Sequence, residues 1–511
     1  MRVLFLNPPF HPRFSREQRS PAVTKSGTLY YPKWLCHAAG VAIREGHDVD
    51  VLDAPAAQLS LQAVLDRVEA KNIAAIVCDT STPSIVNDVH VLDALHEANH
   101  KLHLILVGRH VSAMPAETFA MSLSVQAIAL REYEYTIRDW LAALECGASL
   151  ESVDGLIWRS SDGEIITNKA RQAIQNLDEL PFVSEVYKRF LHVPDYFYGH
   201  SLWPLVVFDT SRGCPYKCSF CVYPQTFSGH TMRYRSKEHV ADEFDFVSRE
   251  MPEVKTVMLE DDTFIISKKR TMELAKELIR RGNRLRFDSN CRADVGADPE
   301  LLSTLRKAGA RLFCVGFESG DPEVIRGIRK NNTEARDANY HQEAKKFARL
   351  CKRADIKIHG CFMIGNLNET RASMEKTLKF AMDLKPDTAQ FFPIMVYPGT
   401  ESFRQAAELG YLATSEWSEW LTEDGLHNSV INLPNVSHQE LVEFCDKARR
   451  RFYLSPGYLI RKALQSLRDP REFQRNLKGF AALSKYLVRG SFGFAGEGKN
   501  PINKPNHSVE A

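Results

Sequence analysis

Short β-branched runs alternate with stretches of helical periodicity over roughly the first 140 residues of the chain. Apolar residues recur at helical spacing in residues 59–70 and 84–99. Four short apolar runs predict buried strands, at residues 3–6, 49–52, 73–77 and 104–107. This alternation indicates a parallel, doubly wound sheet. Ligands bind such sheets beyond the carboxyl ends of the strands, which here carry residues 7–9, 53–55, 79–82 and 108–110.

A second alternation begins at residue 205. Its predicted strands are residues 205–209, 256–259, 285–288, 312–317, 356–363 and 389–394, and its helices include 268–281, 299–308 and 334–354. Six strand–helix repeats predict a (β/α) barrel or part of one. The chemistry of such a barrel lies at the carboxyl ends of its strands.

The segments around these two units are simpler. Residues 155–166 read as a small hairpin, and residues 438–467 and 472–487 as helices. The tail is rich in Gly, Pro, Asn and Lys and is expected to be disordered. We therefore predict an α/β chain with a doubly wound domain (1–145), a connector (146–200), a partial barrel (201–412), a helical region (413–489) and a tail (490–511).

Composition restricts the function very little. The 511 residues are 44% hydrophobic and 25% charged, and the formal net charge is +2, so global charge favours neither nucleic acid nor membrane. The apolar run at residues 1–7 is too short for a secretory signal, and no run of about 18 apolar residues predicts a spanning helix. We expect a cytosolic protein.

Three of the eleven cysteines fall within eight residues: Cys214, Cys218 and Cys221, directly after the first barrel strand. The other eight are scattered and read as small buried hydrophobes, namely Cys36, Cys78, Cys146, Cys291, Cys314, Cys351, Cys361 and Cys445. Thiolates bind iron–sulfur clusters, and a four-iron cluster with three protein ligands leaves one iron for a small chelating molecule. Structural zinc, with His230 as a fourth ligand, is the alternative, but the ligands of such sites usually come as two closely spaced pairs along the chain.

The pattern Cys-x-x-x-Cys-x-x-Cys, with Phe220 before the last cysteine, resembles the radical S-adenosylmethionine (SAM) superfamily. The resemblance implies a [4Fe-4S] cluster whose open iron chelates SAM. One electron, from a donor such as flavodoxin or ferredoxin, then yields a 5′-deoxyadenosyl radical that abstracts hydrogen from a substrate.

The resemblance also assigns residues after later strands to SAM. Glu260, Asp261 and Asp262 would meet its amino group. Asn290, Arg292, Glu318 and Ser319 would meet its carboxylate and ribose, and the strand with Met363 and Gly365 its adenine. Acidic residues at strand ends are also common as helix caps. One departure is the sequence of residues 366–370, which replaces the family's usual Pro-Gly-Glu-Thr.

The N-terminal domain resembles the B12 (cobalamin)-binding domains found in one subclass of this superfamily, through residues 107–115 and 131–134. The Asp-x-His-x-x-Gly motif that supplies a cobalt ligand is missing. His11 and His110 are candidates to approach a corrin, although a loop histidine is more often solvated. Retention and loss of cobalamin both stay open.

Residues 185–235 resemble enzymes that modify hopanoid lipids and anaerobic porphyrin-ring cyclases. Between residues 447 and 489 the chain carries twelve cations and two anions beside apolar stripes. This segment reads as a membrane-surface element or as a set of helices packed on the barrel. RNA binding is a weaker third option, because no aromatic-rich platform for a single strand is evident, and DNA is not an expected partner. We predict a radical SAM enzyme that cyclises, methylates or couples a lipid or other hydrophobic small molecule. A methylthiolating RNA-modifying enzyme and a non-catalytic metal-binding scaffold are the alternatives.

Overall fold

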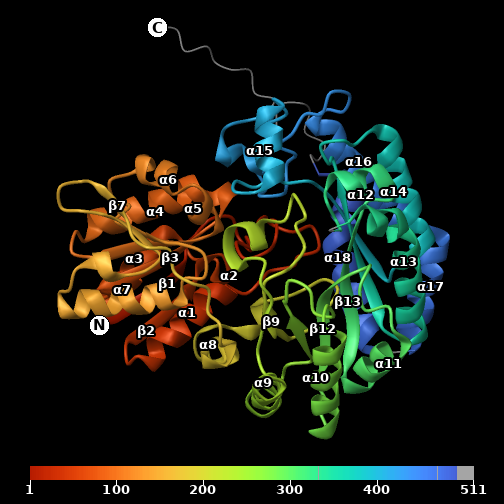
Figure 1. Ribbon diagram of the computed structural model, residues 1–511, viewed down its shortest axis with the longest axis horizontal. Coiled ribbons are helices and arrows are strands. Elements are labelled where there is room, and N and C mark those ends of the chain that lie inside the picture. Colours follow the sequence, from red (N-terminus) through yellow and green to blue (C-terminus); the bar gives the residue numbers. More distant parts are fainter. Residues whose placement is uncertain (332, 469, 492–511) are drawn as a thin grey trace.

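The computed structural model describes residues 1–331, 333–468 and 470–491, and two sheets organise it, one mostly and one wholly parallel (Figure 1). The N-terminal sheet has seven strands in the order β2-β1-β3-β4-β5-β6-β7. Its strands are β1 (Arg2–Asn7), β2 (Asp48–Asp53), β3 (Ala75–Thr80), β4 (His103–Gly108), β5 (Ala127–Ala129), β6 (Leu156–Arg159) and β7 (Ile165–Thr167). The four predicted strands are confirmed, and β1 to β5 run parallel.

The predicted hairpin, β6 and β7, joins this sheet. It pairs antiparallel with β5, so it extends the edge of the sheet beyond residue 145. The helices of this part are α1 (Lys33–Arg44), α2 (Ala54–Ala57), α3 (Leu61–Ala70), α4 (Ile85–Ala98), α5 (Arg109–Ala113), α6 (Pro115–Met121) and α7 (Glu134–Cys146). Helix α1 was not predicted, because residues 33–42 are all buried and show no polar face to read.

The second sheet has six parallel strands whose order in space follows the chain. They are β8 (Leu205–Phe208), β11 (Thr256–Leu259), β12 (Arg286–Arg292), β13 (Ala310–Glu318), β14 (Lys357–Ile364) and β15 (Thr388–Pro393). The helices around them are α9 (Lys237–Glu250), α10 (Lys268–Arg280), α11 (Pro299–Ala308), α12 (Pro322–Gly327), α13 (Glu334–Arg353), α14 (Arg371–Leu384) and α15 (Glu401–Glu408). The predicted partial barrel is confirmed. Two further elements lie outside its sheet, α8 (Val183–Phe190) and the ribbon of β9 (Ser211–Arg212) and β10 (Arg233–Tyr234).

Three helices end the described chain: α16 (His438–Tyr453), α17 (Pro456–Arg468) and α18 (Pro470–Arg489). The predicted helix 438–467 is broken after Tyr453, where Pro456 cannot continue the hydrogen-bond ladder. Most of the predicted disordered tail, from residue 492, lies outside the described residues. Among the described helices, none is long and apolar enough to cross a membrane.

Buried ion pairs join the two sheets. The Arg212 guanidinium after β8 lies 2.7 Å from Glu134 at the start of α7, and 3.0 Å from Asp209. Asp209 also faces Lys33 and His37 of α1, at 3.4 and 3.2 Å. These charges come from both halves of the chain, so they fix the barrel mouth against the N-terminal domain.

Candidate active site

The three clustered cysteines lie in the loop that follows β8. Cys218 is buried, whereas Cys214 and Cys221 are half-buried. Gly213 adopts a φ of +91°, and a Cβ there would clash with the carbonyl oxygen of Thr231. The Gln225 amide donates to the carbonyl oxygens of Cys221 (2.9 Å) and Cys218 (3.3 Å). The chain itself therefore shapes this loop.

Two of the predicted acidic residues hold the same loop. Asp261 is fully buried and accepts hydrogen bonds from the Thr210 backbone and hydroxyl, each at 2.6 Å, and from the Ser211 hydroxyl at 2.8 Å. Asp262 accepts from the Gly213 amide at 3.1 Å. Asp261 thus serves the loop backbone, while Asp262 also borders a cavity.

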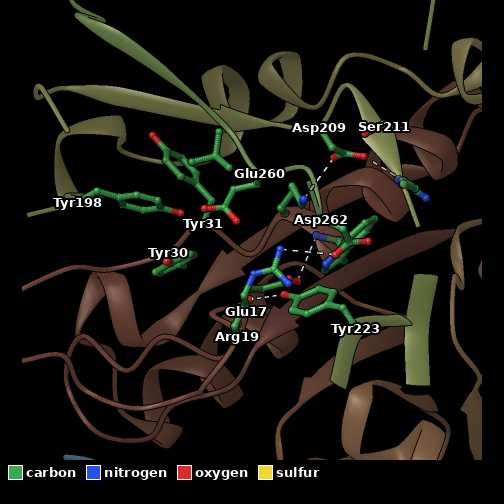
Figure 2. Close-up of a pocket in the computed structure, with 14 residues that line it drawn as sticks. Glu17, Arg19, Tyr30, Tyr31, Tyr198, Asp209, Ser211, Tyr223, Glu260 and Asp262 are labelled. Carbon is green, nitrogen blue, oxygen red and sulfur yellow. Dashed lines mark hydrogen bonds and ion pairs between the residues drawn. The ribbon is translucent and has the colours of Figure 1, made fainter. Parts of the chain in front are cut away.

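That cavity, of about 420 Å³, lies between the N-terminal segment and the barrel (Figure 2). Tyrosines from both halves line it, including Tyr30 and Tyr198, together with Glu260 at the end of β11. Arg19 also lines it, and its guanidinium lies 3.5 Å from Asp262.

Glu260 has an oxygen available in this cavity. Its Oε2 accepts a hydrogen bond from the Asn290 amide at 3.1 Å, while its buried Oε1 has no hydrogen-bond partner among the described residues. Burial raises the pKa of Glu260, and the charges of Lys33 and Arg19 oppose that shift. A carboxylate with one unpaired oxygen suits an ammonium group, which can donate to it.

Arg292 lies beside the cysteine loop. Its Nη1 is 3.6 Å from the Cys218 sulfur, and its guanidinium stacks over Tyr216 at 3.6 Å. Two 2.9 Å hydrogen bonds join it to the Asp294 carboxylate. This guanidinium is paired with a carboxylate of the chain, and it contributes positive charge next to Cys218.

The other predicted residues lie further along the barrel. Glu318 is buried in an ion pair with Lys330 (2.6 Å), and the Ser319 hydroxyl is 3.0 Å from Thr377. The Gly365 amide donates to Glu369 (2.6 Å), which shapes the loop whose sequence departs from the family's. Met363 is buried and Phe220 is half-buried against the main core.

The donor set fits an iron–sulfur cluster, because one loop of the described chain supplies three thiols. Burial raises the pKa of Cys214 to about 11 and that of Cys221 to about 12. Both are therefore protonated thiols in the metal-free chain, and binding a cluster releases their protons.

His110 is not solvated, contrary to expectation. It lies in α5, is fully buried, and its Nδ1 is 3.2 Å from the Thr82 hydroxyl. Its Nε2 is buried with no hydrogen-bond partner in the described chain, and the Trp417 ring lies 5.3 Å away. Burial lowers the pKa of His110 to about 3, so the imidazole is neutral. His11 is half-buried.

Residues 8–32 contribute side chains to the cavity that the sequence pattern did not indicate. Glu17, Arg19 and Tyr30 line the cavity but come from an irregular segment without periodicity. The sequence pattern also indicated isolated hydrophobes at Cys314 and Cys361. That was wrong, because their sulfurs lie 3.6 Å apart beside His359.

Comparisons with known proteins agree with this geometry. Residues 209–381 match the radical SAM superfamily, and residues 19–140 match the B12 binding domain. The chain is 28% identical over 479 residues to the uncharacterized methyltransferase PH0819 of Pyrococcus horikoshii, covering 91% of this chain and 98% of that protein. It is 24% identical to the anaerobic magnesium-protoporphyrin IX monomethyl ester cyclase of Rubrivivax gelatinosus, covering 90% and 78%.

Solved structures share the fold. The radical S-adenosylmethionine methyltransferase TsrM from Kitasatospora setae superposes with a TM-score of 0.65 at 17% identity, covering 88% of this chain and 89% of that one. The cobalamin-dependent S-adenosylmethionine radical enzyme OxsB gives 0.67 at 16% identity, covering 95% and 72%. The barrel is therefore a radical SAM domain, and a B12 binding domain precedes it in the chain. The chain is a radical SAM enzyme, and its radical SAM domain implies a [4Fe-4S] cluster and SAM.

The B12 binding domain match supports cobalamin as a further cofactor. The unpartnered Nε2 of His110 and Nη1 of Arg109 lie at the sheet edge where it would bind. However, the free space there admits little more than a single water molecule. Residues 8–32 cover the edge, and Arg109 donates to the backbone oxygens of Arg16 and Gln18 at 2.7 and 2.9 Å. A corrin does not fit this arrangement of residues 8–32.

Proposed function

We propose that this radical SAM enzyme activates a carbon–hydrogen bond of a hydrophobic, lipid-type biosynthetic intermediate, with Cys214, Cys218 and Cys221 as the cluster ligands. The cluster with SAM supplies a 5′-deoxyadenosyl radical when bound. One observation carries the proposal. The cavity that contains Glu260 lies between residues 8–32 and strand β8, which leads into the cysteine loop. Cyclisation, methylation and coupling are all compatible with this site.

The residues of the chain would divide the remaining work. Glu260, with its unpaired oxygen, would accept a hydrogen bond from the SAM amino group. Asn290 would hold the Glu260 carboxylate in place through its own hydrogen bond to it. Asp261 would support the cysteine loop. Tyr30, Tyr198 and the rest of the aromatic lining would exclude water, which protects a reactive intermediate.

The Glu260 assignment predicts a specific loss of SAM affinity. Glu260→Gln keeps the shape but removes the negative charge, so an ammonium–carboxylate ion pair becomes a weaker hydrogen bond from the ammonium to an uncharged amide oxygen. We expect SAM to bind the reconstituted enzyme about tenfold or more weakly, measured by equilibrium dialysis, since charged hydrogen bonds contribute about 1.5–3 kcal/mol. Glu300→Gln, on the exposed first turn of α11, is the matched control. Equal affinity in the two variants would remove Glu260 from the SAM site.

The relatives support a hydrophobic substrate. Besides the porphyrin-ester cyclase, the hopanoid C-3 methylase of Methylococcus capsulatus is 27% identical over 209 residues, covering 41% of this chain and 38% of that one. An electron donor such as flavodoxin or ferredoxin would supply the reducing electron. RNA modification and a non-catalytic scaffold are not favoured.

The exposed side chains of helices α17 and α18 favour a role in binding a membrane surface. They expose a set of large apolar side chains, each about half or more accessible: Leu459, Ile460, Leu464, Leu467, Phe473, Leu477 and Phe480. Several cations of this region instead fasten the helices. Arg475 pairs with Glu472 at 2.9 Å, and Arg450 donates to the Leu487 carbonyl at 2.8 Å. Apolar insertion rather than basic charge would therefore dominate binding to a lipid surface.

Flotation with liposomes of phosphatidylcholine and phosphatidylglycerol tests this surface. The wild-type chain should float with the vesicles, and the triple variant Ile460→Asp, Leu464→Asp, Leu467→Asp should remain in the dense fraction. Leu123→Asp, which alters an equally exposed leucine (82%) in the other domain, should float like the wild type. Flotation of the triple variant, or failure of the wild type to float, would exclude a lipid-binding role for α17 and α18.

A further inference from the structure

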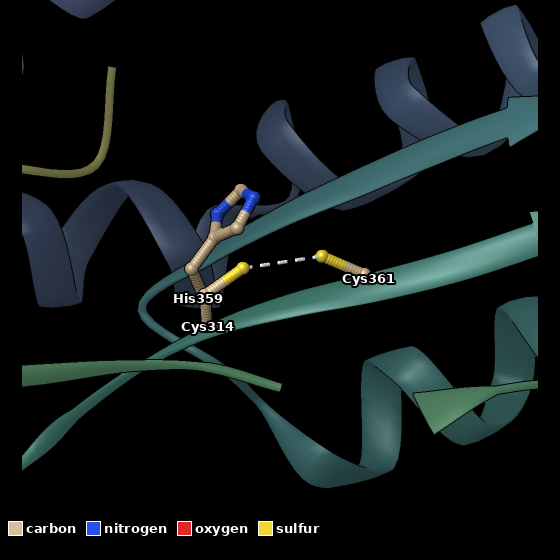
Figure 3. Close-up of side chains that lie close together, drawn as sticks. All are labelled: Cys314, His359 and Cys361. Carbon is tan, nitrogen blue, oxygen red and sulfur yellow. Dashed lines mark hydrogen bonds between the residues drawn. The ribbon is translucent and has the colours of Figure 1, made fainter. Parts of the chain in front are cut away.

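Three metal-ligating side chains meet inside the barrel although the sequence separates them. Cys314 lies on β13, and His359 and Cys361 lie on the neighbouring strand β14. The register pairs Cys314 with His359, and residues two apart on a strand face the same side, so Cys361 shares that face. The three ligand atoms lie within 4.8 Å of one another (Figure 3).

The distance between the sulfurs fits a shared metal ion. They are 3.6 Å apart. Two thiolates about 2.3 Å from a tetrahedral zinc ion would lie roughly 3.8 Å apart. A disulfide needs about 2.05 Å, so these thiols are too far apart to be bonded.

His359 is already oriented for a ligand role. Its Nδ1 is 2.8 Å from the Thr388 hydroxyl, which leaves Nε2 available to bind a metal. Histidines that bind metals commonly use the second ring nitrogen in such a hydrogen bond, which fixes the tautomer and the ring orientation. The ring also stacks on His200, with centroids 4.6 Å apart and planes 19° apart.

We propose that Cys314, His359 and Cys361 bind one zinc ion. Two sulfur ligands and one nitrogen ligand suit zinc, and three protein ligands leave one tetrahedral position open. Structural zinc sites usually have four protein ligands, whereas an open position is the mark of a site that binds a further molecule.

The cluster of Cys314, His359 and Cys361 lies near the candidate active site. Burial together with the charges of Glu260, Cys314 and Cys361 raises the pKa of Tyr30, so these groups lie within electrostatic reach of each other. Tyr30 and Glu260 line the 420 Å³ cavity. An oxygen or nitrogen donor of the substrate would complete the zinc coordination. This last role rests on the proposed function, whereas the metal site itself does not.

Zinc content measured without any activity assay tests the site. The full-length chain with Cys214, Cys218 and Cys221 replaced by Ala is purified and dialysed, because those thiols would otherwise bind zinc themselves. We expect about one zinc ion per chain. Cobalt(II) in place of zinc should give a thiolate-to-cobalt charge-transfer absorption. The anaerobically reconstituted wild type should contain the same single zinc beside its iron.

Variants locate the ion. The double variant Cys314→Ser, Cys361→Ser should lose both the bound zinc and the cobalt charge-transfer absorption. Cys351→Ser alters a buried cysteine of α13 and should leave both unchanged. His359→Gln keeps both thiols and should still weaken zinc binding. This loss would show that the imidazole is a ligand beside the two cysteines. Zinc missing from the parent proteins, or retained by the double variant, would overturn the proposal. Two thiols that become titratable only after reduction would overturn it in favour of a disulfide. None of these outcomes bears on SAM cleavage.

Discussion

Replacing Cys214, Cys218 or Cys221 with Ala is expected to abolish cluster assembly. A four-iron cluster with only two protein thiolates lacks the ligands to hold it in this loop. Anaerobic reconstitution should therefore incorporate about four irons per chain in the wild type and almost none in each variant. Production of 5′-deoxyadenosine from SAM should fall to background in the same variants.

The matched control is Cys291→Ala. Cys291 is also buried, on β12, but its sulfur lies 3.5 Å from the Ser289 hydroxyl and it is outside the cysteine loop. This variant should bind iron and cleave SAM like the wild type. If Cys291→Ala lost the cluster, or a triad variant kept it, the ligand assignment would be wrong.

Arg16→Met is expected to destabilise the N-terminal domain by about 3–5 kcal/mol, because it leaves a buried carboxylate without its partner. The Arg16 guanidinium is fully buried and lies 2.5 Å from Asp88. It also donates to the Asn7 side chain and the Pro8 carbonyl, each at 2.7 Å. Arg16 thereby fastens residues 8–32 over the edge of the sheet, so its loss should also loosen the cavity.

Denaturant unfolding followed by circular dichroism measures this loss. Arg2→Met is the matched control, since Arg2 pairs with Asp48 on the surface, with side chains 44% and 59% exposed. Exposed pairs contribute about 1 kcal/mol or less. Similar midpoints for the two variants would show that the buried pair does not hold the segment.

The regular elements of the fold could be predicted because their local signals agree with their packing. Helix α11 matches its predicted bounds because Asp298 caps it, Pro299 begins it and Gly309 ends it. Helix α1 escaped prediction because it is buried on all sides. Strand β12 continues beyond its predicted end through polar residues that face the site, including Asn290 and Arg292.

The site itself was only partly predictable. Local spacing identifies the cysteine triad, but the cavity depends on residues 8–32 meeting a barrel that begins some two hundred residues later. Asp261 and Arg292 carry suitable chemistry, yet neighbouring groups already occupy their side chains. Cys314 and Cys361 are 47 residues apart, and only the strand register brings them together.

The most direct test of the central claim is the fate of SAM in the reconstituted wild type. The protein is loaded with iron and sulfide under anaerobic conditions, given SAM and a chemical reductant, and analysed for 5′-deoxyadenosine and methionine. Both products should form together in the wild type and should be missing when the three cysteines are replaced. A protein that binds zinc at the triad, or that carries about four irons yet yields no 5′-deoxyadenosine, would contradict the central claim.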